Sequence, residues 1–221
     1  MSDIAAIVRT AQRHLKPILD CSGNILYSSV GTLRPGLIYL LGLNPGGDPR
    51  RHGRQTLRRV LQKLPSKTNN EYLDETWDGQ STPGTGLLQR RVKWLAAELR
   101  HDLQKVCASN LIFVRSRDAR SSGYPELAKL CWPVHEAILE IVRPRLVVTF
   151  GNSSISPYAF LRSVLGEAFR ERTFRAGHGN WRCRAFRTAN RMWVVGLPHL
   201  SRYAVNHHPE VAEWLRRMAA A

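Results

Sequence analysis

Three polar side chains that could do chemistry follow apolar runs in this chain. Asn44 lies near the end of GLIYLLGLNPGGDP at 36–49, Asn110 within VCASNLIFV at 106–114, and His199 directly after RMWVVGLP at 191–198. An amide both donates and accepts hydrogen bonds, and an imidazole can donate one to an oxygen that gains negative charge. The sequence has no carboxylate pair beside them, no nucleophile-elbow serine, no phosphate-binding P-loop and no metal-ligand spacing. These absences disfavour paired acid/base, serine-nucleophile and metal-dependent chemistry.

The elements that must position these side chains alternate between strand and helix. Apolar runs at 36–49, 106–114 and 145–153 predict strands buried on both faces, and two further strands are expected at 182–189 and 191–198. Helices are expected at 3–19, 53–64, 87–103, 125–142, 156–166 and from Pro209 onward, with a long surface loop at 65–86. This pattern predicts a single domain, 1–221, with an α/β fold. We expect a three-layer α/β/α sandwich around a central, mostly parallel sheet of four to five strands.

Ligands of such sheets bind beyond the carboxyl ends of the strands. This rule places Asn44, Asn110 and His199 at one edge of the sheet, together with the turn at 151–154 and the segment LPHLSRY at 197–203. The sequence therefore predicts one polar site built from the ends of several strands.

The composition favours a polyanionic partner. The 221 residues include 33 Lys and Arg against 17 Asp and Glu, a formal net charge of +16, and arginine exceeds lysine. Arginine pairs bidentately with phosphate, so nucleic acid is the leading partner, and a basic solvated surface is the alternative. The positive charge gathers in two clusters: Arg50, Arg51, Arg54, Arg58, Arg59 and Lys63, and Arg170, Arg172, Arg175, Arg182, Arg184, Arg187 and Arg191.

Other classes of protein are disfavoured by the same composition. Hydrophobic residues make up 43% and charged residues 23% of the chain, which argues against disorder. No apolar stretch approaches the roughly 20 residues that span a bilayer, and the N-terminus lacks a signal-peptide pattern. The four cysteines are widely separated, which predicts free thiols. We expect a cytoplasmic protein without a membrane partner.

Four segments in this order resemble the uracil-DNA glycosylase superfamily. GLNPGGDP and LPHLSRY resemble its two paired motifs, and SNLIFV and RPRLVVTFGNSS resemble two of its strands, so that the similarity covers about residues 36 to 204. The motif types are closest to the mismatch-specific and single-strand-selective branches. The resemblance implies a monofunctional DNA glycosylase, a hydrolase that flips an altered base out of DNA and excises it, leaving an abasic site. Without a lysine in these motifs or a close cysteine pair, we expect no lyase activity, no iron–sulfur cluster, no metal and no cofactor. A monomer that acts on DNA is expected.

The resemblance also assigns roles to residues. Asn44 would orient the attacking water, and His199 would donate to the base oxygen as negative charge accumulates there. Asn110 would face the base edge, where one orientation of its amide suits uracil and the flipped one suits cytosine. The base pocket is expected to contain Leu43, Gly46, Gly47, Leu57 and Asn110. DNA contacts are expected from Pro45, Asn152, Ser153, Ser201, Arg50, Arg51 and Arg54, with either Arg202 or Tyr203 inserted into the vacated stack.

Three positions depart from the family pattern. Gly46 stands where the uracil-specific branch has a tyrosine, and Leu57 where several branches have a stacking aromatic residue. Both changes predict a roomier pocket. Leu200 replaces a usual proline, which predicts a less rigid loop.

These departures leave the substrate and the pathway open. The candidate bases are uracil, mismatched thymine, hypoxanthine or a 5-substituted, hypermodified cytosine, in base excision repair or in antiviral defence against phage with modified DNA. A second hypothesis is a catalytically inactive nucleic-acid-binding protein with the same fold.

Overall fold

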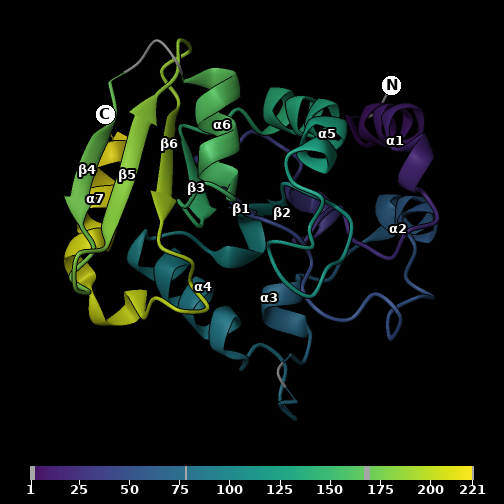
Figure 1. The fold of residues 1–221 in the computed structure, drawn as a ribbon, viewed down its shortest axis with the longest axis horizontal. Coiled ribbons are helices and arrows are strands. Elements are labelled where there is room, and N and C mark those ends of the chain that lie inside the picture. The colour runs from purple at the N-terminus through teal and green to yellow at the C-terminus, as the bar shows by residue number, and fades with distance from the viewer. Residues whose placement is uncertain (1–2, 78, 167–169, 221) are drawn as a thin grey trace.

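The computed structural model describes residues 3–77, 79–166 and 170–220, and within them six strands form one sheet. The strand order is β2-β1-β3-β6-β5-β4 (Figure 1). The strands are β1 Ile38–Gly42, β2 Cys107–Asn110, β3 Leu146–Phe150, β4 Arg172–Arg175, β5 Arg182–Arg187 and β6 Trp193–Leu197.

Four neighbouring strands are parallel and two are antiparallel. β1 pairs in parallel with β2 and β3, and β3 pairs in parallel with β6, so Gly42 lies opposite Asn110 and Phe150 opposite Leu197. β5 runs antiparallel to β6, and β4 antiparallel to β5. The predicted α/β fold with a mostly parallel sheet is confirmed. The edge strand β4 was not predicted, because its sequence RTFR is short, largely exposed and without an apolar run.

Helices pack on both faces of the sheet and bury two separate apolar clusters. Alternate residues of each strand point to opposite faces, so Tyr39 and Leu41 join one cluster and Ile38 and Leu40 the other. The first cluster includes residues of α1 Asp3–His14, α2 Leu57–Lys63, α5 Glu126–Val142 and α6 Pro157–Leu165. The second includes residues of α3 Glu71–Asp74, α4 Leu87–Glu98 and α7 Pro209–Ala220. Helix, sheet and helix thus form the three expected layers.

Local sequence signals explain where several elements begin and end. The side chain of Ser156 accepts a hydrogen bond from the backbone N–H of Ala159 and caps α6. Thr56 caps α2 in the same way, so this helix begins at Leu57 and not at residue 53 as predicted. Residues 65–86, predicted as a loop, contain the short helix α3. No helix in the described ranges is long and apolar enough to span a membrane.

Candidate active site

The carboxyl ends of the parallel strands bring the three predicted polar residues to one edge of the sheet. Asn110 is the last residue of β2, Asn44 lies two residues beyond β1, and His199 two residues beyond β6. A Cβ atom on Gly151, in the turn after β3, would lie 3.8 Å from His199 Cδ2. In Figure 1 the arrows of β3 and β6 point the same way, toward this edge. The edge is formed by the ends of all four parallel strands.

Hydrogen bonds fix the orientation of the Asn44 amide. Its Nδ2 donates to the carbonyl oxygen of Pro45 at 2.8 Å and to Ser116 Oγ at 2.9 Å. Ser116 Oγ donates its own proton to the carbonyl oxygen of Asp118 at 2.7 Å, so it can only accept from Asn44. Both amide protons are therefore engaged, and Asn44 Oδ1 remains as an acceptor that can hold a water molecule.

The imidazole of His199 is held as a neutral donor. Its Nδ1 accepts the backbone N–H of Ser201 at 3.2 Å and lies 2.7 Å from Ser201 Oγ. Because Nδ1 accepts, the ring proton resides on Nε2. The side chain is exposed, yet partial desolvation by its surroundings lowers the pKa of His199, and the charge of Arg202 lowers it further. The lowered pKa favours the neutral ring, which presents an N–H without a positive charge.

The Asn110 amide carries an unsatisfied donor. Asn110 is 5% exposed, and its Nδ2 has no hydrogen-bond partner among the residues the structure describes. Its Oδ1 lies so close over β1 that any side chain on Gly42 would collide with it, so this position requires glycine. Leaving a buried donor unpaired costs about 1–3 kcal/mol. A ligand that brings an acceptor to Nδ2 would recover this free energy.

Sequence reasoning missed Tyr27, which lies beside Asn110. Tyr27 lies in a segment that runs antiparallel along β2, where Leu26 forms a bridge with Ser109. Burial raises the pKa of Tyr27, and the charge of Arg115 and the side chain of Asn110 oppose this rise. Arg115 and Asn110 therefore lie near the Tyr27 hydroxyl. No motif marks Tyr27, because its position depends on pairing between distant segments.

Arg115 spans the loop after β1. Its guanidinium donates to the carbonyl oxygen of Gly46 and, at 3.1 Å, to Gln55 Oε1, whereas its buried Nε has no partner in the described ranges. Through these hydrogen bonds Arg115 fixes the glycine loop. Together with Asn110, Arg115 contributes a second unpaired buried N–H to this region.

The predicted pocket residues separate into two groups. Gly46 and Gly47 are exposed, and a Cβ on Gly46 would meet no atom within 4 Å. Leu43 and Pro45 are buried in the loop below them. Leu57, in contrast, has no exposed surface and packs in the core, where a Cβ on Gly23 would lie 2.9 Å from it. The assignment of Leu57 to the base pocket is therefore wrong in this conformation, because α2 directs it inward.

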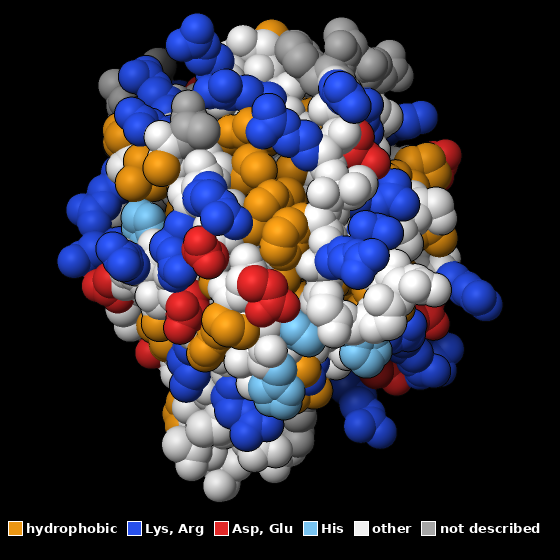
Figure 2. Space-filling model, turned by 90° about the vertical axis from the view of Figure 1, so that its left-hand side faces the viewer, with side chains coloured by type: hydrophobic (Ala, Val, Ile, Leu, Met, Phe, Trp, Pro, Cys, Tyr) orange, Lys and Arg blue, Asp and Glu red, His pale blue; other side chains and the backbone are white. Residues whose placement is uncertain are grey.

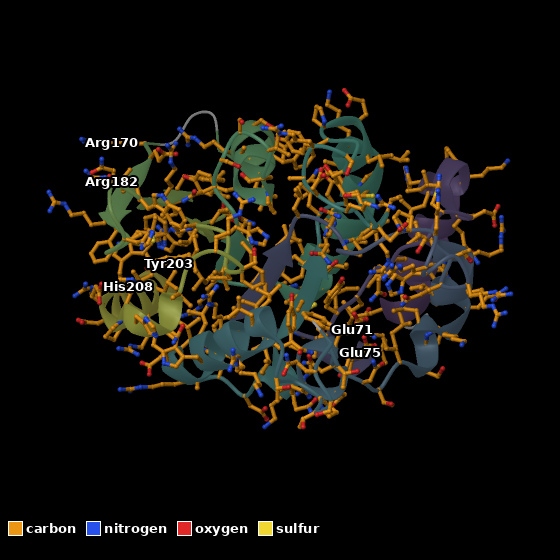
Figure 3. The ribbon with its side chains drawn as sticks, turned by 60° about the horizontal axis from the view of Figure 1, so that its bottom comes forward. Glu71, Glu75, Arg170, Arg182, Tyr203 and His208 are labelled. Carbon is orange, nitrogen blue, oxygen red and sulfur yellow. The ribbon has the colours of Figure 1, made fainter. Side chains whose placement is uncertain are left out.

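The expected DNA-contacting loop is only partly exposed. Ser201 and Arg202 are exposed, but Tyr203 is 1% exposed, donates to the carbonyl oxygen of Ala176 at 2.5 Å and stacks on His208 with ring centroids 5.2 Å apart. Figure 3 shows Tyr203 and His208 next to each other. Of the two expected wedge residues, Tyr203 is excluded by burial and Arg202 remains.

The other expected contacts are anchored by the fold. Asn152 donates to the carbonyl oxygens of Arg182 at 2.7 Å and Gly196 at 2.9 Å, which links the turn after β3 to β5 and β6. Ser153 is exposed and donates to the carbonyl oxygen of Ile155. Leu200 is fully buried and its carbonyl oxygen accepts from Arg91 at 2.5 Å, so packing and a hydrogen bond hold the loop where proline is lacking.

Basic side chains cover two surfaces. Arg50, Arg51 and Arg54 are exposed in the loop between β1 and α2. The second surface surrounds β4 and β5, and Figure 2 shows Lys and Arg side chains spread over this side of the molecule around a stripe of hydrophobic side chains. Both predicted clusters are therefore solvent-accessible.

A cavity of about 710 Å³ lies between α2 and α3, lined among others by Arg54, Gln55, Lys67 and Glu71. Glu71 is 5% exposed and accepts hydrogen bonds from Asn24 and, at 3.1 Å, from Lys67 Nζ. Burial raises the pKa of Glu71 to about 7. In Figure 3 Glu71 lies well apart from Tyr203 and His208.

Comparison with known proteins finds no family model that matches this chain and no curated protein with significant similarity to it. Within residues 3–77, 79–166 and 170–220, no group of three or more His, Cys, Asp or Glu side chains could hold a metal ion. The geometry of the site and the sequence motifs are therefore the basis for a functional proposal.

Proposed function

We propose that this protein is a monofunctional DNA glycosylase that hydrolyses the bond between an altered base and its deoxyribose, leaving an abasic site. The observation that carries the proposal is His199, whose Nδ1 accepts from the backbone N–H of Ser201 so that Nε2–H is left as a donor. It lies at the same sheet edge as the free carbonyl of Asn44 and the unpaired amide of Asn110. A departing base anion requires such a donor, and a comparable donor in other enzymes contributes about 3–4 kcal/mol.

The reaction assigns one role to each group. The N-glycosidic bond breaks, and its electron pair leaves with the base while positive charge develops on the sugar. His199 Nε2–H hydrogen-bonds the base oxygen that gains negative charge, and Asn44 Oδ1 holds the water that adds to C1′. The water loses its proton to solvent, and the base anion takes one from solvent. An amide is not a general base, so stabilisation of the leaving group drives the reaction.

The orientation of Asn110 favours a base with a carbonyl at the edge that it contacts. The unpaired Nδ2 would donate to O4 of uracil or to an equivalent carbonyl. The open space beside Gly46 accommodates a substituent at C5. We therefore propose uracil or a 5-substituted pyrimidine as the base. Such a base could be removed in DNA repair or from the modified DNA of phage.

The proposal extends to the partner and the compartment. DNA is the proposed partner because exposed arginines flank the site edge and arginine pairs well with phosphate. The four cysteines are unpaired, which suits the reducing cytoplasm. We propose a cytoplasmic enzyme that acts as a monomer.

The test is alkali-dependent cleavage of end-labelled DNA. Parallel duplexes carry uracil, mismatched thymine, hypoxanthine, 5-hydroxymethylcytosine or glucosylated 5-hydroxymethylcytosine. Strand breaks that appear only after alkali are expected, and the substrate that breaks names the base. DNA binding without breaks in any duplex would replace the proposal with a catalytically inactive nucleic-acid-binding protein.

A further inference from the structure

Trp181 is an exposed aromatic side chain at the candidate site edge. It lies in the hairpin between β4 and β5, residues 176–181, and is 38% exposed. β5 runs antiparallel to β6, with Arg184 opposite Gly196, so the start of β5 lies beside the carboxyl end of β6. The hairpin therefore emerges next to the loop that carries His199. The ring centroid of Trp181 lies 6.3 Å from that of Tyr203 in this loop.

Three interactions tie the hairpin to the site. The hydroxyl of Tyr203 donates to the carbonyl oxygen of Ala176, and Asn152 donates to that of Arg182. Gly177 has φ +76°, and any side chain there would collide with His208, so glycine permits the close approach to α7. The hairpin is thus held at both ends by residues that adjoin the candidate site, and Trp181 projects from a supported position.

The flanks of the hairpin carry unbalanced positive charge. Arg175 and Arg182 are exposed and lie directly opposite each other in the β4–β5 pairing. Neither forms an ion pair with an acidic side chain in the described parts of the chain. Like charges that face each other across two strands are destabilising, and a polyanion would relieve this repulsion. Trp181 directly precedes Arg182 in the chain, and an exposed aromatic ring that neighbours arginines is a combination that binds unstacked bases and their phosphates.

We propose that Trp181 stacks on a DNA base exposed when the target nucleotide leaves the helix, while Arg175 and Arg182 contact the adjoining phosphates. This assignment rests on the proposed glycosylase function and supplies the aromatic contact that the buried Tyr203 cannot make. Stacking by Trp181 stabilises the complex only where a base has lost its neighbour in the stack. Intact duplex gives Trp181 no such base.

The test compares binding of two duplexes, one intact and one with a tetrahydrofuran abasic analogue that leaves a gap in the stack. Trp181→Ala should weaken binding to the gapped duplex by about tenfold, because base–aromatic stacking contributes about 1–3 kcal/mol. Binding to intact duplex should change by less than about twofold, because phosphate contacts dominate there. Trp181→Phe should retain most of the preference. Leu37→Ala, which removes another exposed apolar side chain, should have no effect.

Three results would overturn the assignment: equal affinity of wild type for both duplexes, unchanged binding by Trp181→Ala, or an equal loss on both duplexes. None of these measurements requires excision. Alkali-dependent cleavage by wild type is scored separately, so absence of cleavage with an intact Trp181 effect would reject the glycosylase function and keep the stacking contact. Cleavage without a Trp181 effect would keep the glycosylase function and reject the stacking contact.

Discussion

The parallel and antiparallel parts of the sheet differ in where they place polar groups. In β1, β3 and β6 every residue is buried, and the functional side chains follow only at the carboxyl ends. There His199 is neutral and Asn44 is held by Ser116 and Pro45. β4 and β5 instead expose arginines along their length. Under the proposed function this difference would be a division of labour, in which the parallel part supplies the reacting groups and the antiparallel part holds a polyanion.

Loss of the His199 imidazole should have the largest effect on the reaction. We expect His199→Ala to lower single-turnover excision by about 10²- to 10³-fold, the usual loss for one oxyanion donor. DNA affinity should change by less than about threefold, because phosphate contacts determine it. His14→Ala removes an exposed imidazole from α1 and serves as the control. A parallel loss of affinity and excision would contradict the division of labour.

A side chain at Gly46 should alter base selection without loss of the fold. The space around a Cβ at Gly46 is open, so Gly46→Tyr should fold and place a ring beside the base. Excision of 5-substituted pyrimidines should fall by about tenfold or more relative to uracil, since the ring excludes the substituent. The measurement is the ratio of single-turnover rates on the two substrates. An unchanged ratio would refute the pocket argument.

The hydroxyl of Ser116 should matter less, because it acts only through Asn44. Ser116→Ala removes one of the acceptors that orient the Asn44 amide. We expect excision to fall by about 3- to 10-fold, in keeping with about 1 kcal/mol for one hydrogen bond. DNA affinity should stay constant. Ser163→Ala, which removes a hydroxyl that donates only within α6 to the carbonyl oxygen of Phe160, is the matched control. A loss as large as that of His199→Ala would give Ser116 a direct part in the reaction.

Much of the fold could be predicted from the sequence, because continuous apolar runs identify strands that are buried on both faces. The meeting of Asn44, Asn110 and His199 at one edge followed from the rule for parallel strands. What failed depended on tertiary contacts. Leu57 and Tyr203 lie in polar, basic surroundings in the sequence, and only the packing of α2 and the hydrogen bond to Ala176 show that they are buried. Tyr27 joins the site through pairing beside β2, which no local pattern indicates.

Removal of the paired arginines should have the smallest effect and should act on binding alone. The double variant Arg175→Gln and Arg182→Gln should reduce the slope of log K against log salt by about 1.8, or 0.9 for each lost phosphate contact. Excision at saturating enzyme should be unchanged. Arg9→Gln with Arg13→Gln on α1 removes two exposed charges at the other side of the molecule and is the control (Figure 1). An equal change in slope for both double variants would show that net charge, and not the β4–β5 surface, determines binding.

We propose that the carboxyl ends of the parallel strands carry out base excision. A comparison of cleavage and DNA binding by wild type and Asn44→Ala tests this most directly. Both proteins are assayed for alkali-dependent cleavage and for binding of the same uracil-containing duplex. We predict cleavage by wild type, loss of about 10²-fold or more in Asn44→Ala as the water loses its acceptor, and similar binding by both. Equal cleavage by both proteins, or binding with no cleavage by wild type, would contradict the account.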